Sequence, residues 1–271
     1  LRIDYSILEQ HAEAYRKIRN TFRYLLGNLK DNVKDFEAKS TNVKEMPELE
    51  QYILHKLFQL NEKIKNNFSG YNFHNLYKEL LNFCTVDLSA FYFDIRKDTL
   101  YCESLKSKKR ENCIDALNII TNCLLRWFAP ILTFTSEEIY KIINKKEESI
   151  HLEKFPQLPN NWKNDELESK WKELISIRDR CNISIEEKRA EKIIGSSLEA
   201  HVVLKLDEKQ YNKFKDFDFA ELFITSKVDL KVINKTDGDN NIITSKAVGV
   251  KCPICWKIRE KKCSRPNCTL N

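Results

Sequence analysis

Four cysteines lie close together near the end of the 271-residue sequence. Two residues separate Cys252 from Cys255, seven separate Cys255 from Cys263, and four separate Cys263 from Cys268. Thiolates suit Zn²⁺, which takes a tetrahedral shell of four ligands, and a pair at the shorter spacing can bind it from one tight turn. The spacing therefore predicts one Zn²⁺ per chain, held by these four cysteines.

Other uses of these thiols stay open at this point. They could be four unrelated buried side chains or a redox pair, and the usual iron–sulfur spacings differ from this one. The gap of four residues before Cys268 is also wider than in a regular zinc ribbon. Because the surrounding tail has little apolar content, a bound metal would supply much of its folding free energy.

The same tail is strongly basic. The chain carries 46 Lys and Arg against 40 Asp and Glu, a formal net charge of +6. In residues 247–271, Glu260 is the only acidic residue, and the cations are Lys251, Lys257, Arg259, Lys261, Lys262 and Arg265. Cations interleaved with the aromatic ring of Trp256 can neutralise phosphates and stack on a base. We expect Trp256, Lys257 and Arg259 to contact nucleic acid, with a solvated basic tail as the alternative.

No self-contained active site is predicted. The five glycines lie at least 11 residues apart, which excludes a P-loop and a dinucleotide-binding fingerprint, since both need clustered glycines. The five histidines are scattered along the chain. The other cysteines follow helical periodicity, and we interpret them as small core residues: Cys84, Cys102, Cys113, Cys123 and Cys181.

The first 150 residues show apolar positions at steps of three and four, which predicts an antiparallel helical bundle. One helix is expected from about Lys108 to Ala129, where Pro130 stops it, and Thr135 is expected to cap the next. Arg96 and Lys97 directly follow the apolar run of an earlier helix. We expect both to contact nucleic acid, although cations on a helix flank are often simply solvated.

The pattern changes beyond Ser149. A proline-containing linker at 155–159 precedes a helix capped by Asp165, and strands are predicted at 202–206, 222–233 and 242–250. We therefore expect a mainly α protein in which an antiparallel helical bundle (1–150) is followed by a small α+β domain (151–246). A zinc knuckle (247–271) completes the chain.

The composition also predicts where the protein works. No apolar run approaches the roughly 20 residues that span a bilayer, so no membrane partner is expected. The first residues lack the basic start and long apolar stretch of a secretory signal. We expect a cytoplasmic protein, where thiols stay reduced and clustered cysteines bind metal.

Several segments, in this order, resemble the C-terminal third of bacterial-type isoleucyl-tRNA synthetases. Three of them resemble the opening helix, the crossing segment and the closing motif of the anticodon-binding bundle of that family: Tyr15–Leu29, Asn82–Tyr101 and Ala129–Tyr140. Two others favour the isoleucine enzymes over their valine and leucine relatives: Glu191–Ala200 and Lys251–Trp256.

The resemblance implies a ligase that joins isoleucine to its tRNA with ATP, in which this portion holds the anticodon stem-loop, as a monomer. The HIGH and KMSKS motifs of the family do not occur in these residues. We therefore expect the adenylating domain upstream in a longer protein, and no activity from this portion alone. The alternative is a freestanding zinc-containing module that binds nucleic acid without ligase activity.

Overall fold

The computed structural model describes residues 4–29, 42–144, 148–233, 241–261, 263 and 265. The chain forms two compact units. Residues 1–100 and 105–168 make the first unit, and residues 101–104 and 169–271 make the second. None of the described helices is long and apolar enough to cross a membrane.

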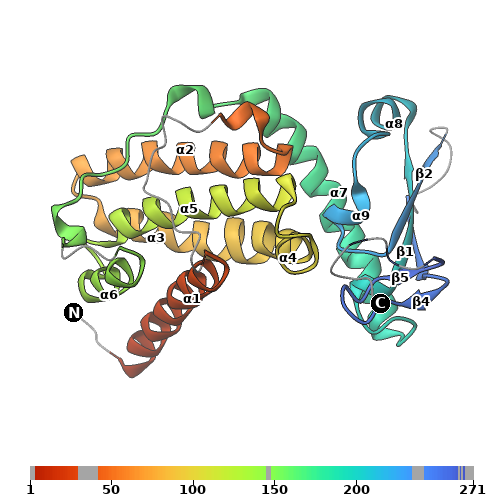
Figure 1. The fold of residues 1–271 in the computed structure, drawn as a ribbon, viewed down its shortest axis with the longest axis horizontal. Coiled ribbons are helices and arrows are strands. Elements are labelled where there is room, and N and C mark those ends of the chain that lie inside the picture. Colours follow the sequence, from red (N-terminus) through yellow and green to blue (C-terminus); the bar gives the residue numbers. More distant parts are fainter. Residues whose placement is uncertain are drawn as a thin grey trace. The chain divides into compact units, whose positions relative to one another are not determined.

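The first unit is helical (Figure 1). Its α-helices are α1 (Tyr5–Leu29), α2 (Glu48–Ser69), α3 (Phe73–Asn82), α4 (Phe93–Cys102), α5 (Lys108–Phe128) and α6 (Thr133–Ile143). A π-helical stretch, η3 (Phe83–Tyr92), joins α3 to α4 without a break, and short 3₁₀ turns occur at Val43–Glu45, Ile150–Leu152 and Asn160–Trp162. The last residues of α4 belong to the second unit.

Helix α5 lies at the centre of this bundle. It packs against α1, α2 and α6, and most of its residues are buried. An edge-on ring contact between Phe22 and Phe128, with centroids 5.9 Å apart, closes the core between α1 and α5. The observed bounds of α5 lie close to the predicted ones. The helix ends where expected because Pro130, which follows, lacks the backbone N–H that a further turn would need.

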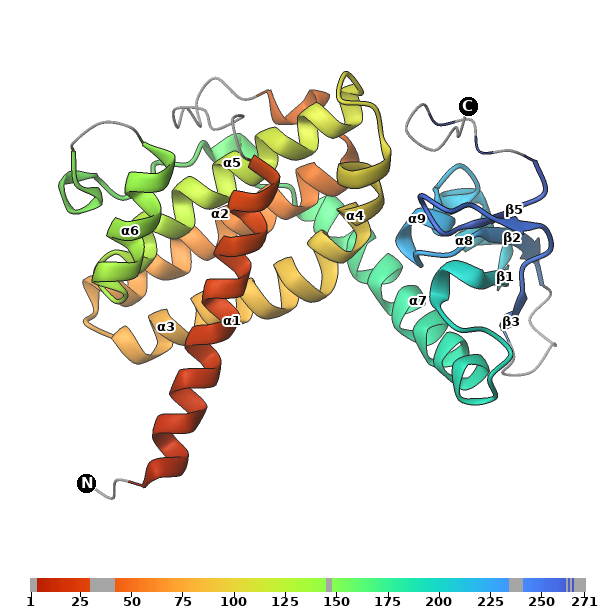
Figure 2. The same ribbon diagram turned by 60° about the horizontal axis from the view of Figure 1, so that its bottom comes forward.

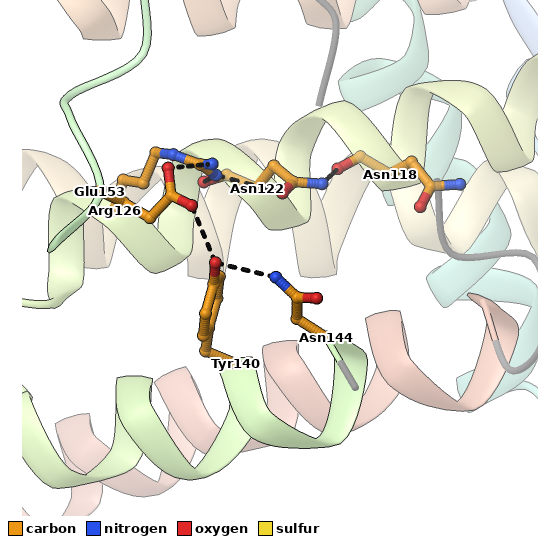
Figure 3. A network of polar contacts seen from close by, with 6 residues as sticks. All are labelled: Asn118, Asn122, Arg126, Tyr140, Asn144 and Glu153. Carbon is orange, nitrogen blue, oxygen red and sulfur yellow. Dashed lines mark hydrogen bonds and ion pairs between the residues drawn. The ribbon is translucent and has the colours of Figure 1, made fainter. Parts of the chain in front are cut away.

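The stretch that follows α6 packs onto the bundle. Arg126 on α5 donates to Glu153 (Nη2–Oε2 2.9 Å), and Tyr140 on α6 donates to the other carboxylate oxygen of Glu153 (2.8 Å), as Figure 3 shows. Trp162 is buried farther along. Residues 151–168 therefore belong to the first unit, whereas the sequence places its boundary at residue 150.

The second unit combines a long helix with a small sheet (Figure 2). Its elements are most of α7 (Asp165–Ala190), a 3₁₀ turn at Ser197–Glu199, α8 (Glu208–Phe214), α9 (Phe219–Leu222), and the strands β1 (Ala200–Leu206), β2 (Lys227–Val232), β3 (Ile242–Lys246), β4 (Val250–Lys251) and β5 (Ile258–Arg259). The order of the main sheet is β2-β1-β3, and β4 pairs with β5.

Strand β1 is central and sets the register. Val202 faces Val228 of the parallel strand β2 and Thr244 of the antiparallel strand β3. Alternate β1 residues are buried, which is the period of a half-buried strand. The predicted class, a bundle with a small α+β domain, is confirmed.

The local predictions for α6 and for the start of β2 are wrong. The stretch expected as a strand from Leu222 begins instead within α9, because Asp218 caps that helix by accepting the N–H of Glu221 (2.9 Å). Helix α6 begins at Thr133, two residues before the expected cap. Thr135 shares a hydrogen bond with the hydroxyl of Tyr15 (2.8 Å) on α1 instead.

Candidate metal centre and nucleic-acid interface

Three of the four predicted metal ligands come together in the second unit. The Sγ atoms of Cys252, Cys255 and Cys263 all lie within 4.8 Å of one another, and all three side chains are buried. Cys268 lies outside the described residues, so its role stays a prediction. The cluster agrees with a zinc-binding knuckle.

A tight turn holds the first two cysteines. Trp256 donates its backbone N–H to the carbonyl of Cys252 (2.9 Å), and Cys252 donates its own to the carbonyl of Lys257 (2.9 Å). These two bonds close the loop that follows β4 and return the chain into β5. The two-residue spacing between Cys252 and Cys255 therefore lies in a tight turn, as the sequence predicts.

The donor set fits a soft divalent cation. Burial raises the pKa of the Cys255 thiol above its usual value, and the neighbouring Cys252 and Cys263 thiols add to this rise. Three thiolates this close would repel one another strongly, whereas Zn²⁺ would hold them deprotonated as ligands. With a fourth ligand, these residues would form a structural site.

The structure adds Cys102, which the sequence did not connect with this cluster. This last residue of α4 is buried against the knuckle cysteines. Beside it, Glu103 lies 3.6 Å from Arg265 of the tail (Oε1–Nε). Some 150 residues separate Cys102 from Cys252, so no local spacing could have revealed the association.

Trp256 occupies an unusual backbone conformation at the tip of the knuckle. Its φ of +60° lies in the left-handed region, which non-glycine residues seldom adopt, and its side chain is 60% exposed. The aromatic ring is thus held in solvent, where another molecule can reach it. Such a ring can stack on an unpaired base.

The predicted cationic contacts differ in their accessibility. Lys257 is only 7% exposed, whereas Arg259 on β5 is partly exposed and borders a hollow in the second unit. In the first unit, Lys97 is exposed and lies 2.9 Å from Asp94 one turn earlier. Lys97, Trp256 and Arg259 are therefore the open members of the predicted set.

Arg96 has a structural role instead. It is 2% exposed, and its Nε and Nη2 each donate to one carboxylate oxygen of Glu50, both at 2.6 Å. The hydroxyl of Tyr92 donates to the same carboxylate (3.0 Å). This buried fork joins α4 to α2, so a contact with RNA would require breaking it. The structure thus corrects the expectation for Arg96.

A carboxylate links the knuckle to the sheet. Glu199 accepts hydrogen bonds from the backbone N–H of Gly195 (3.0 Å) and from the ammonium of Lys251 (2.9 Å) on β4. These bonds lower the pKa of Glu199, that of Gly195 having the largest effect. The segment Glu191–Ala200 therefore positions the start of the knuckle.

A second group of possible metal ligands lies in the first unit. Donor atoms of His55, Asp165 and Glu168 lie within 4.8 Å of one another. His55 Nδ1 accepts the backbone N–H of Asn164 (2.9 Å), so in the neutral ring Nε2 carries the proton. Nε2 points toward Glu168 (3.5 Å). A protonated nitrogen cannot ligate a metal, and the group instead fixes the start of α7.

Comparison with known proteins agrees with this architecture. Residues 50–204 match the model of the anticodon-binding domain of tRNA ligases. The chain is 57% identical over 266 residues to an isoleucine–tRNA ligase of Pelagibacter ubique, covering 98% of this chain and 29% of that protein. It is 38% identical over 268 residues to the Agrobacterium fabrum enzyme, covering 95% and 27%.

The helical bundle with its matched segment defines the class: an anticodon-binding domain of tRNA ligases. Within that class, the chain belongs to the isoleucine–tRNA ligase family and corresponds to its C-terminal part. It spans less than a third of the length of the curated relatives that it matches.

Proposed function

We propose that this chain binds the anticodon stem-loop of isoleucine tRNA, as part of a longer ligase that charges this tRNA with isoleucine using ATP. The observation that carries the proposal is the exposed Trp256, held in a left-handed conformation on the cysteine knuckle, three residues before Arg259 in the sequence. The match to the anticodon-binding domain of tRNA ligases supports the proposal, and so does the similarity to isoleucine–tRNA ligases.

The chemistry suits a single-stranded target. Anticodon bases are unstacked, so they can lie against an aromatic ring and be read by hydrogen bonds from cationic side chains. We assign the stacking to Trp256, and phosphate contacts to Arg259 and Lys97. One Zn²⁺ held by Cys252, Cys255, Cys263 and Cys268 would keep the knuckle rigid, and the full enzyme would work in the cytoplasm.

Filter binding tests this proposal. The zinc-loaded 271-residue chain is titrated with isoleucine tRNA, with the same tRNA carrying an altered anticodon, and with one altered only in the acceptor stem. We expect the altered anticodon to weaken binding about tenfold, since one stacked base is worth ~1–3 kcal/mol. The acceptor-stem change should have no effect. Equal affinity for all three RNAs would reject anticodon recognition.

A further inference from the structure

A hollow of about 600 Å³ lies within the second unit, between the main sheet and the β4–β5 pair. Its volume falls in the range of roughly 300–1,000 Å³ that is usual for ligand sites. The residues that matter for its chemistry are His201, Ser226, Lys227, Val248, Arg259 and Lys261. Only Arg259 among them belongs to the contacts predicted from sequence.

Two small residues hold β5 in its place beside this hollow, Ser226 in the lining and Gly249 next to it. Ser226 donates its hydroxyl to the carbonyl of Leu198 and accepts the backbone N–H of Ile258 (2.6 Å), which ties β5 to the start of β2. Gly249 has a φ of +130°, and a Cβ there would lie 2.3 Å from the carbonyl oxygen of Arg259. Glycine thus permits the close approach that brings Arg259 to the hollow.

The lining favours an anion. It contains three cationic side chains, Lys227, Arg259 and Lys261, against one carboxylate, Glu260, and one of the three, Lys227, also lies 3.7 Å from the carboxylate of Asp229 (Nζ–Oδ2). The Nε of Arg259 is buried and has no hydrogen-bond partner among the residues that the structure describes. A buried guanidinium N–H without an acceptor costs free energy unless a ligand supplies one. A phosphate oxygen is a matching acceptor.

The other lining groups suit a base or sugar. His201 is held by Asp229, whose Oδ2 lies 2.8 Å from its Nε2, so the ring has a fixed orientation. Val248 is largely exposed at the hollow and offers an apolar contact. A fixed ring, an apolar contact and clustered cations are the elements with which proteins hold single-stranded nucleic acid.

We propose that this hollow binds one nucleotide of the RNA strand, with a backbone phosphate held by Lys227, Arg259 and Lys261. This proposal rests on the proposed function. It gives the RNA a second point of contact with the protein, in addition to Trp256. The charge and the partnerless Nε favour a phosphodiester over an acidic peptide, whose binding would be an outcome of the test below.

The test uses the zinc-loaded 271-residue chain and a fluorescein-labelled anticodon stem-loop RNA. The double variant K227A/K261A removes two lining cations, and the matched control K209A/K215A removes two exposed cations of α8 and its end. We expect about tenfold weaker binding for K227A/K261A, and a slope of log affinity against log salt reduced by about one. The control should stay within twofold of wild type.

Lysine footprinting supplies an independent readout. The RNA should protect Lys227 and Lys261 from acylation and leave Lys209 and Lys215 reactive, whereas a poly-glutamate peptide should protect none of them. If thermal melting shows that K227A/K261A is misfolded, K227Q/K261Q replaces it.

Four results would overturn the proposal. Wild-type affinity of K227A/K261A without protection would reject the hollow and leave anticodon binding intact, and so would protection by the peptide alone. If K227A/K261A and K209A/K215A weakened RNA binding equally, the lysines would attract the RNA through general surface charge and not through a specific site. A wild-type chain that binds no anticodon RNA would reject the hollow and the proposed function together.

Discussion

Arg96 and Arg259 illustrate how the two units use the same side chain differently. In the bundle, the guanidinium of Arg96 is buried, and its Nε and Nη2 donate to the two carboxylate oxygens of Glu50. In the second unit, Arg259 borders a hollow, and its buried Nε has no partner among the described residues. The apolar core of a bundle requires a buried charge to be neutralised, whereas Arg259 lies beside a hollow that a ligand could enter.

Loss of the metal should have the largest effect. C255S removes one of the three clustered thiols that would hold the zinc, and structural zinc contributes on the order of 10 kcal/mol to the folding of such small modules. We expect loss of the one bound zinc in elemental analysis and loss of anticodon RNA binding. Helical circular dichroism should be retained.

C181S provides the control, because Cys181 is buried on α7 and lies outside the cysteine cluster. It should keep its zinc. If C255S also retained one zinc per chain, the metal centre would have to be placed elsewhere.

Arg96 should matter for stability and not for RNA. R96A leaves Glu50 buried without its partner, and breaking such a pair costs ~3–5 kcal/mol in the free energy of unfolding, measured with urea. K97A removes the neighbouring exposed cation and should cost less than about 1 kcal/mol. Weaker RNA binding by R96A at unchanged stability would restore Arg96 as a contact.

Trp256 should show the opposite behaviour. W256A should weaken anticodon RNA binding by ~1–3 kcal/mol, the value of one stacked base, and change the melting temperature little. W256F is the matched control, because phenylalanine keeps an aromatic ring and must adopt the same left-handed backbone conformation at this position. Equal binding by W256A and W256F would remove the stacking role.

His55 should give the smallest effect, seen in the pH dependence. Burial lowers its pKa below the ordinary value of about 6.5 in the folded state. The unfolded chain then takes up a proton first, so stability present above pH 6.5 is lost as the pH falls through the folded pKa. Urea midpoints at pH 7.5 and 5.5 should differ more for wild type than for H55Q; equal differences would contradict this role.

The repetitive features of the fold could be predicted from sequence. The apolar period of α5 and the stop at Pro130 place that helix almost to the residue. Local capping is harder, because it depends on partners: Thr135 bonds to Tyr15 on another helix, and Asp218 starts a helix where apolar residues suggest a strand.

The candidate site divides in the same way. The knuckle cysteines lie close together in the sequence, so Cys252, Cys255 and Cys263 could be recognised from their spacing alone. The position of Cys102 depends on a contact across most of the chain. The burial of Arg96 depends on Glu50 lying opposite, and a basic residue after an apolar run looks the same in sequence whether it is solvated or paired.

The most direct test compares anticodon discrimination with and without zinc. Affinities for isoleucine tRNA with its native and its altered anticodon are measured on the zinc-loaded chain and after removal of the metal. If the knuckle reads the anticodon, the roughly tenfold preference for the native anticodon should disappear with the metal, while the bundle stays folded. An unchanged preference in the metal-free chain would show that the anticodon is read elsewhere.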